Sequence, residues 1–258
     1  MADASPSLAQ LRAEIDGIDD ALLDLLERRI AIGRRVAAAK GDASGPFLRP
    51  GREAQILRRL AARLDGGDLP VAVMERVWRE ILAANLARQV APVTVVWAPA
   101  GAEALVELAR DRGGISTRIE TVAGPDAAIA AIAHGRATLA VLPAPELTAW
   151  RWWPTLLACS PAKPRIVARL PLFGALDSVA GVGLACQEPD PSGDDVTLWA
   201  VAGRCRDAVD VAEGPDGTAR SLLARDGWPA DAELPTGAVA VGAYARTHAS
   251  RAPHSRSY

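Results

Sequence analysis

The sequence predicts an all-helical N-terminal region followed by a C-terminal α/β region. Up to about residue 90, apolar residues recur at spacings of three and four, which is the period of a helix. From residue 93 onward, short β-rich runs alternate with amphipathic segments. Glycine- and proline-rich stretches separate the helical segments. We therefore expect domains at 1–90 and 93–250, with a loose tail over 247–258.

The first helix is predicted from Leu8 to Lys40. Ser5 followed by Pro6 is typical of an N-cap and a first helical turn. At 1.5 Å per residue this helix is on the order of 50 Å long, and such a length indicates a partner. Its apolar residues are Leu8, Leu11, Ile15, Ile18, Leu22, Leu25, Ile32 and Val36.

Two further helices are predicted after the glycine- and proline-rich stretch GDASGPFLRPGRE. They run from Arg52 to Leu64 and from Pro70 to Gln89, with the turn DGGDLP between them. One face of the third helix carries polar and apolar side chains at spacings of three and four. These are Trp78, Ile81, Asn85 and Gln89.

The second region reads as βαβαβ and then as further strands. The first five elements are TVVWA, AEALVELARD, TRIETV, DAAIAAIAHG and ATLAVLP, which predict a parallel sheet with helices packed on it. Four later strands are PRIVARLPLF, GVGLACQE, VTLWAVAG and AVAVGAYA, and we expect a helix around Thr218 to Arg225. The aromatic cluster AWRWWP is either part of the core or a platform for a ligand.

Composition narrows the class of protein. The chain has 258 residues, of which 50% are apolar, so it can bury substantial cores. A net charge of −2 argues against a nucleic-acid binder and against an acidic tail. No apolar run approaches the roughly 20 residues that span a bilayer, and the acidic N-terminus does not resemble a secretory leader. We expect a protein that is neither exported nor embedded in a membrane.

Cysteine and histidine positions point to a reducing compartment and to no metal. The cysteines Cys159, Cys186 and Cys205 form no CxxC pair, which favours the cytoplasm. The histidines His134, His248 and His254 lack the spacing of metal ligands. Motifs for phosphate, dinucleotide, zinc-protease and serine-hydrolase chemistry are absent from the sequence.

Cations are concentrated between residues 28 and 52. Seven of them stand against the single acid Asp42: Arg28, Arg29, Arg34, Arg35, Lys40, Arg49 and Arg52. Such a run is either a solvated surface or an anion site. Arg29 and Lys40 are about three turns apart, roughly 16 Å, on nearly the same helix face, so both can lean toward one ligand. Arg12 lies around 100° away and serves a different pocket or a different subunit.

The run LAQLRAEIDGIDDALLDLLERRIAIGRRVAAAK, the following RPGRE and the late NLARQ resemble the all-helical class of chorismate mutase over roughly residues 7 to 90. The resemblance implies three helices per chain that intertwine with a second chain into a homodimer with long, shared first helices. It also implies the rearrangement of chorismate to prephenate in aromatic amino-acid biosynthesis, without a metal or other cofactor. The site residues follow from the same resemblance.

By position, Arg12 matches an arginine donated by the partner subunit, and Arg29 matches an arginine of the same chain. Both would hold substrate carboxylates, for which the planar guanidinium is suited. Lys40 and Gln89 match the residues on either side of the ether oxygen. Negative charge grows on that oxygen in the transition state, so both donors would stabilise the transition state more than the ground state.

The remaining matches lie on the second and third helices. Glu53 matches the acid that hydrogen-bonds the ring hydroxyl, and Arg52 matches a further active-site arginine. Two positions depart from the family pattern, since Arg49 stands where an aspartate often occurs and Asn85 where a serine does. An asparagine still donates and accepts hydrogen bonds.

Residues 93 to 250 weakly resemble a prephenate dehydratase region, which implies a periplasmic-binding-like α/β fold. About residues 196 to 246 would then be a shortened relative of a small domain that senses phenylalanine. The Thr-Arg-aromatic triplet of that family is replaced by residues 183–186, and its Glu-Asn-Ser reads PAPEL. We therefore expect a degenerate region without dehydratase activity.

The sequence is compatible with three other functions. A bifunctional mutase and dehydratase would need a dehydratase site built without the triplet. An isochorismate pyruvate-lyase would keep the same arginines and lysine. A non-catalytic dimeric protein that binds an aromatic metabolite would use the helices only for dimerisation, with the cations solvated.

Overall fold

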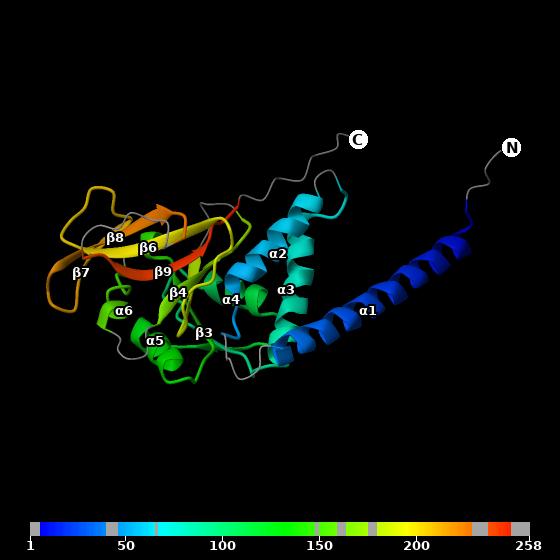
Figure 1. Ribbon diagram of the computed structural model, residues 1–258, viewed down its shortest axis with the longest axis horizontal. Coiled ribbons are helices and arrows are strands. Elements are labelled where there is room, and N and C mark those ends of the chain that lie inside the picture. Colours follow the sequence, from blue (N-terminus) through cyan, green and yellow to red (C-terminus); the bar gives the residue numbers. More distant parts are fainter. Residues whose placement is uncertain are drawn as a thin grey trace. The chain divides into compact units, whose positions relative to one another are not determined.

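The computed structural model of the protein describes residues 6–39, 46–64, 67–147, 150–158, 164–174, 180–228 and 237–248. The chain divides into two compact units, Met1–Gly45 and Pro46–Tyr258. The first unit contains helix α1, and the second contains all other elements. The predicted division into helices followed by an α/β region is confirmed (Figure 1).

Helix α1 spans Leu8–Ala39, as the apolar period predicted, and Lys40 lies outside the described residues. Ser7 and Gln10 form its N-terminal cap. The Gln10 amide donates to Ser7 Oγ at 3.3 Å, and the Ser7 amide donates to Gln10 Oε1 at 2.8 Å. The predicted cap, Ser5, lies outside the described residues. Large apolar side chains along this helix are exposed in the single chain: Leu8, Leu11, Ile15, Ile18, Leu22, Leu23, Leu25, Ile32 and Val36.

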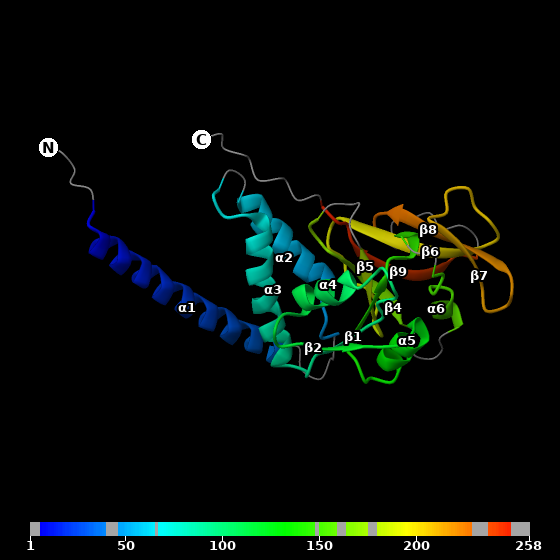
Figure 2. The same cartoon turned by 180° about the vertical axis from the view of Figure 1, so that it is seen from behind.

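Helices α2 (Pro50–Arg63) and α3 (Val71–Ala87) pack side by side (Figures 1 and 2). Their shared core also includes side chains from the α/β region, so this pair does not stand apart from the sheet. The core residues are Ala54, Leu57, Met74, Leu172 and Ala245.

The prediction that Gln89 lies on the third helix was wrong. Helix α3 ends at Ala87, with Arg88 as its C-cap, and Gln89 follows in a turn. Pro92 has no backbone N–H, so a helix that continued through residue 92 would leave the carbonyl of Arg88 without its partner, and α3 ends before that residue. The predicted polar face of α3 therefore stops at Asn85.

One mixed sheet contains nine described strands in the order β2-β1-β3-β5-β4-β9-β6-β8-β7. Its first part is the predicted parallel unit of β1 (Val93–Val96), β2 (Arg118–Thr121) and β3 (Leu139–Pro143). Helices α4 (Ala104–Gly113) and α5 (Pro125–Ala133) connect these strands. Buried residues of α5 and α4 belong to different core clusters, on opposite faces of the sheet.

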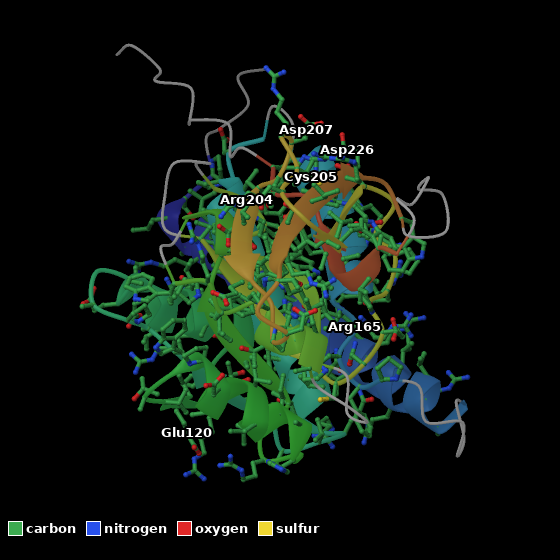
Figure 3. The ribbon with its side chains drawn as sticks, turned by 90° about the vertical axis from the view of Figure 1, so that its left-hand side faces the viewer. Glu120, Arg165, Arg204, Cys205, Asp207 and Asp226 are labelled. Carbon is green, nitrogen blue, oxygen red and sulfur yellow. The ribbon has the colours of Figure 1, made fainter. Side chains whose placement is uncertain are left out.

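The rest of the sheet is antiparallel except where β4 meets β9. The remaining elements are η1 (Pro145–Leu147), α6 (Thr155–Ala158), β4 (Arg165–Leu170), β5 (Gly181–Ala185), β6 (Asp195–Ala202), β7 (Asp210–Glu213), β8 (Ala219–Asp226) and β9 (Val239–Ala245). Figure 3 looks onto the side of β7 and β8, with Asp226 at the end of β8 and Arg165 at the start of β4. The strands from residue 195 onward thus continue the sheet that the first strands begin.

The helix expected around Thr218 to Arg225 was also wrong. The segment is strand β8, in which residues 220–226 pair with β6 and residues 219–222 pair with β7. A short apolar run such as SLLA fits either a helix or a strand by period alone. The pairing partners on both sides decide the outcome here.

Two tryptophans of the AWRWWP cluster lie in the core, as one of the two alternatives predicted. Trp152 and Trp153 are buried, and their indole N–H groups donate to the Pro143 carbonyl at 3.0 Å and to Asp210 at 2.7 Å.

Within the described residues, no helix is both long and apolar enough to cross a membrane. Thr247 and His248 are paired with the segment around Phe173, and residues 249–258 lie outside the described part of the chain.

Candidate active site

The predicted site residues fall on both compact units. Arg12 and Arg29 lie on α1, where Arg12 is exposed and Arg29 is half-buried, and Lys40 lies outside the described residues. Five other predicted residues lie in the second unit, on or beside α2 and α3. They are Arg49, Arg52, Glu53, Asn85 and Gln89.

The first turn of α2 is capped by an acid distant in sequence. Asp190 accepts hydrogen bonds from the backbone amides of Gly51 at 3.0 Å and Arg52 at 3.1 Å. It also pairs with Nε of Arg49 at 3.2 Å. The N-cap Arg49 has no side-chain cap of its own, so the Asp190 carboxylate satisfies amides that the helix leaves without partners. The side chain of Arg49, which was predicted as a site residue, is thus bound to Asp190.

Gly51 permits this close approach. A Cβ atom at residue 51 would lie 2.1 Å from the backbone carbonyl oxygen of Asp190. Any side chain there would push the capping segment away from α2. The side chain of Arg52 stays exposed and donates to Gln55 Oε1 at 3.0 Å.

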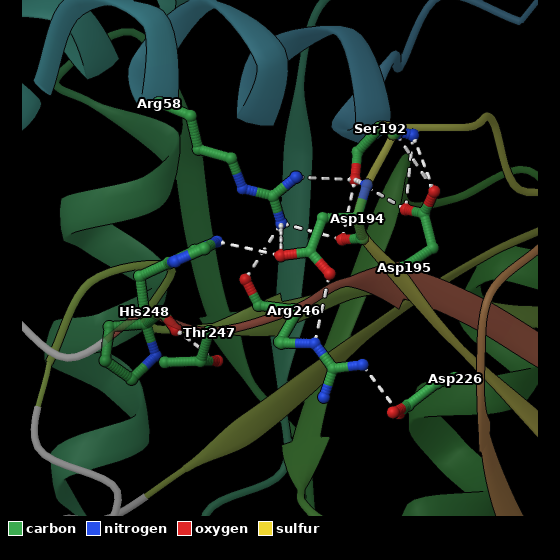
Figure 4. Close-up of polar contacts among 10 residues, drawn as sticks. Arg58, Ser192, Asp194, Asp195, Asp226, Arg246, Thr247 and His248 are labelled. Atoms are coloured by element: carbon green, nitrogen blue, oxygen red, sulfur yellow. Dashed lines mark hydrogen bonds and ion pairs between the residues drawn. The ribbon is translucent and has the colours of Figure 1, made fainter. Parts of the chain in front are cut away.

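A second anchor lies about two turns further along α2, at Arg58 (Figure 4). Its guanidinium donates to Ser192 Oγ at 2.9 Å and to the carbonyl oxygens of Asp194 at 2.8 Å and Arg246 at 2.9 Å. Asp194 in turn pairs with Nε of Arg246 at 3.1 Å. The segment GDDVTL, residues 193–198, therefore begins in a network that fastens α2 to the sheet.

Removal of the Asp190 carboxylate should destabilise the protein measurably. We expect Asp190→Ala to lower the free energy of unfolding by about 2 kcal/mol, since two helix amides and Arg49 lose their partner. Urea unfolding measures the loss. The matched control is Glu188→Ala in the same segment, because the Glu188 carboxylate is 79% exposed and its ion pair with Arg165 should contribute little. Equal losses in the two variants would contradict the capping role.

Glu53 is part of a half-buried network of ion pairs. Its Oε2 accepts from Nη1 of Arg79 at 3.0 Å and from Nη1 of Arg112 at 2.7 Å. Nη2 of Arg79 also donates to Glu75 at 3.3 Å. Burial lowers the pKa of the Arg79 guanidinium, and the nearby charge of Arg112 lowers it further. Burial raises the pKa of the Glu75 carboxyl, although Arg79 opposes that shift.

A cavity of about 230 Å³ borders this network. Its charged wall includes Glu75, Arg79 and Arg112, and its apolar wall includes Leu108 and Phe173. Within the wall, Arg79 pairs with Glu75 and Arg76 pairs with Asp111, whereas Arg112 pairs with Glu53, which does not line the cavity.

The two predicted amides lie near each other at the end of α3. Nε2 of Gln89 donates to the backbone carbonyl of Asn85 at 3.2 Å. Gln89 is exposed and Asn85 is half-buried. The side-chain amide of Gln89, which the resemblance assigns to the ether oxygen, is therefore accessible. Its N–H group donates only to the Asn85 carbonyl within the same segment.

Sequence reasoning missed several groups that hold the α2 turn. These are Arg58, Arg79, Arg112 and Asp190. Only Arg79 offered a signal, because a lone arginine on the inward face of an amphipathic helix needs a buried partner. Among the described residues, no group of three or more His, Cys, Asp or Glu side chains is arranged to hold a metal ion.

Fold and site together define a protein that carries clustered arginines on a helical scaffold and an α/β region joined to that scaffold. Residues 11–90 match the model of the family Chorismate mutase type II. The chain therefore has a chorismate mutase type II domain in its N-terminal region, and the resemblance drawn from the sequence is confirmed.

The similar curated proteins match this same part of the chain. The bifunctional chorismate mutase/prephenate dehydratase of Aquifex aeolicus is 37% identical over 82 residues, which are 31% of this chain and 23% of that protein. The corresponding protein of Stutzerimonas stutzeri is 38% identical over 86 residues, again 31% of this chain and 23% of the relative. The 4-amino-4-deoxychorismate mutase of Streptomyces venezuelae is 43% identical over 54 residues, 21% of this chain and 52% of that protein. The match thus spans about a quarter of the length of the bifunctional relatives.

One solved structure covers most of the remainder. A prephenate dehydratase from Streptococcus mutans aligns with 60% of this chain and 98% of its own, with 12% identity and a TM-score of 0.41. A likeness at that level carries no activity over to this chain.

Proposed function

We propose that the protein is a cytoplasmic chorismate mutase that forms prephenate for aromatic amino-acid biosynthesis. The observation that carries the proposal is the match of residues 11–90 to the chorismate mutase type II family. We further propose that the α/β region does not work as a dehydratase, since the sequence lacks that family's Thr-Arg-aromatic triplet.

In the proposed reaction, the ether C–O bond of chorismate breaks as a new C–C bond forms within the same molecule. The protein has to hold a dianion in a compact shape, and positioning is a large part of such catalysis. Arg29 and a partner's Arg12 bind the carboxylates, while Lys40 and Gln89 donate to the ether oxygen. The residues that complete the proposed pocket are Arg49, Arg52, Glu53 and Asn85.

The arrangement of the α2 turn supports a role for Arg52 and Glu53. The turn is capped by Asp190, so the two residues stand on ordered backbone. The hydrogen bonds of Glu53 within the described residues all fall on Oε2, which leaves Oε1 for a ring hydroxyl. A carboxylate accepts at both oxygens, so this division of roles is chemically sound.

We propose a homodimer formed through α1. Nine large apolar side chains on this helix are exposed in the single chain, each by at least 41%. Exposed apolar area of this kind marks a contact surface, and a second copy of the same helix is the partner that the family resemblance implies. Light scattering of the purified protein measures the mass directly.

The function is tested by incubating the purified protein with chorismate and following its absorbance. We expect chorismate to disappear and prephenate to accumulate, with phenylpyruvate no higher than in a control without enzyme. Phenylpyruvate above that background would restore the bifunctional function. A parallel reaction with 4-amino-4-deoxychorismate separates the two substrate classes named among the relatives. Absence of turnover with both compounds would refute the proposal and favour a binding protein.

A further inference from the structure

We propose that Arg112, which lies on α4 of the α/β region, is a positioning residue for Glu53 in the mutase reaction. The inference rests on the proposed function and adds to it. The α/β region then contributes to substrate binding through Glu53, by means of a side chain outside the segment that matches the mutase family.

The contact between the two side chains is short and shielded from water. Nη1 of Arg112 lies 2.7 Å from Oε2 of Glu53, and their side chains are only 9% and 18% exposed. Charge-assisted hydrogen bonds of this length are roughly twice as strong as neutral ones. Because the pair is largely removed from solvent, salt screens it far less than it screens an exposed pair.

Two arginines from different helices converge on the same oxygen. Arg79 approaches Glu53 from α3, and Arg112 approaches it from α4. With one arginine, the carboxylate would be free to rotate about that single contact. With both, Oε2 is held from two directions, and Oε1 is left without a hydrogen-bond partner among the described residues. This is the oxygen that the proposed function assigns to the ring hydroxyl.

The end of α4 is built to bring Arg112 close to α3. Gly114, the C-cap of α4, has φ +62° and ψ −179°, a conformation essentially restricted to glycine. A Cβ there would lie 2.7 Å from Oε2 of Glu80 and 2.9 Å from Cβ of Ala83, both on α3. The amide of Ile115 donates to Glu80 at 3.0 Å. The helices are thus held in contact two residues beyond Arg112.

The ion pair between Arg112 and Glu53 is specific to these two side chains, because the neighbouring charged groups have other partners. Glu75 already occupies the other nitrogen of Arg79, and Arg76 pairs with Asp111 at the surface at 3.7 Å. Within the described residues, Arg112 has its ion pair with Glu53 alone. Its loss therefore acts on Glu53 first.

The test compares Arg112→Ala with Arg110→Ala in the full-length chain, using chorismate as the probe. Arg110 lies on the same helix in an exposed pair with Glu107 and serves as the control. We expect Arg112→Ala to raise KM about tenfold with kcat within about twofold, because a contact to the ring hydroxyl is made equally in the ground and transition states. Arg110→Ala should match the wild type.

Two further variants guard against a merely structural effect. Arg112→Met keeps a long unbranched side chain for packing and should show the same rise in KM, which also covers the case in which Arg112→Ala does not fold. Arg112→Lys keeps a cation near Glu53 and should recover part of the affinity.

The decisive comparison is made in the Glu53→Gln background. If Arg112 acts through Glu53, Arg112→Met adds less than about twofold to the KM of Glu53→Gln, since coupled residues are not additive. The same tenfold rise in both backgrounds would overturn the inference, and so would wild-type kinetics in Arg112→Met. Absence of turnover in the wild type would instead refute the proposed function, so the two failures are distinguishable.

Discussion

Replacement of Lys40 by alanine should lower kcat/KM for chorismate at least a hundredfold. Negative charge accumulates on the ether oxygen only as the bond breaks, so an ammonium group held there stabilises the transition state above the ground state. Loss of one such preorganised donor costs about 3 kcal/mol, which corresponds to roughly a hundredfold in rate. Steady-state kinetics with purified Lys40→Ala measures the effect.

A control distinguishes this role from a general loss of positive charge. Arg59 is an exposed cation on α2 outside the proposed site, so Arg59→Ala should stay within about twofold of the wild type. Turnover by Lys40→Ala that also stays within that range would contradict the catalytic role. It would favour the non-catalytic binding protein, in which the cations are only solvated.

The fold was predictable from the sequence where the signal is local. The apolar period of α1 predicted a helix, and the run of residues from 93 to 143 predicted a parallel βαβαβ unit. Both predictions were confirmed. Strand order and direction beyond β3 depend on which distant segment pairs with which, and no local period carries that information. The segment now seen as β8 illustrates this limit, because β6 and β7 make it a strand.

Some residues of the candidate site were likewise predictable from the sequence, and others were not. The resemblance places Arg52 and Glu53 next to each other on a helix start, and the structure has them on the first turn of α2. It could not supply Asp190 or Arg112, which lie 139 and 59 residues from their partners Gly51 and Glu53. Contacts of such separation are created by packing of α2 and α3 against the sheet. The roles of all predicted site residues remain proposals.

This packing bears on how the two halves cooperate. Helices α2 and α3 share buried side chains with the α/β region, and the compact units divide at residue 45 rather than near residue 90. The domain boundary expected between residues 90 and 93 follows from the family resemblances and stays a prediction. In energetic terms, the α/β region supports the helices through a shared core, the Asp190 cap and the Arg58 network.

In the proposed dimer each active site contains residues from both chains, so we expect a second large effect on activity from substitution of Arg12 or Arg29. Arg12→Ala and Arg29→Ala should each lose at least a hundredfold in kcat/KM, because each removes a bidentate partner of a substrate carboxylate. If every site takes Arg29 from one chain and Arg12 from the other, a mixed dimer of the two variants has one intact site and one doubly defective site. Random pairing then restores about one quarter of the wild-type activity.

The recovery is measured by coexpressing the two variants, or by unfolding and refolding them together, before the chorismate assay. The matched control pairs Arg29→Ala with Lys40→Ala. Both residues are proposed to act within one chain, so each site of that mixed dimer carries one defect and the activity should not recover. Recovery in the control, or its absence in the mixture of Arg12→Ala with Arg29→Ala, would contradict an arginine donated across the interface. The apolar side chains along α1 would then serve assembly without completing a catalytic site.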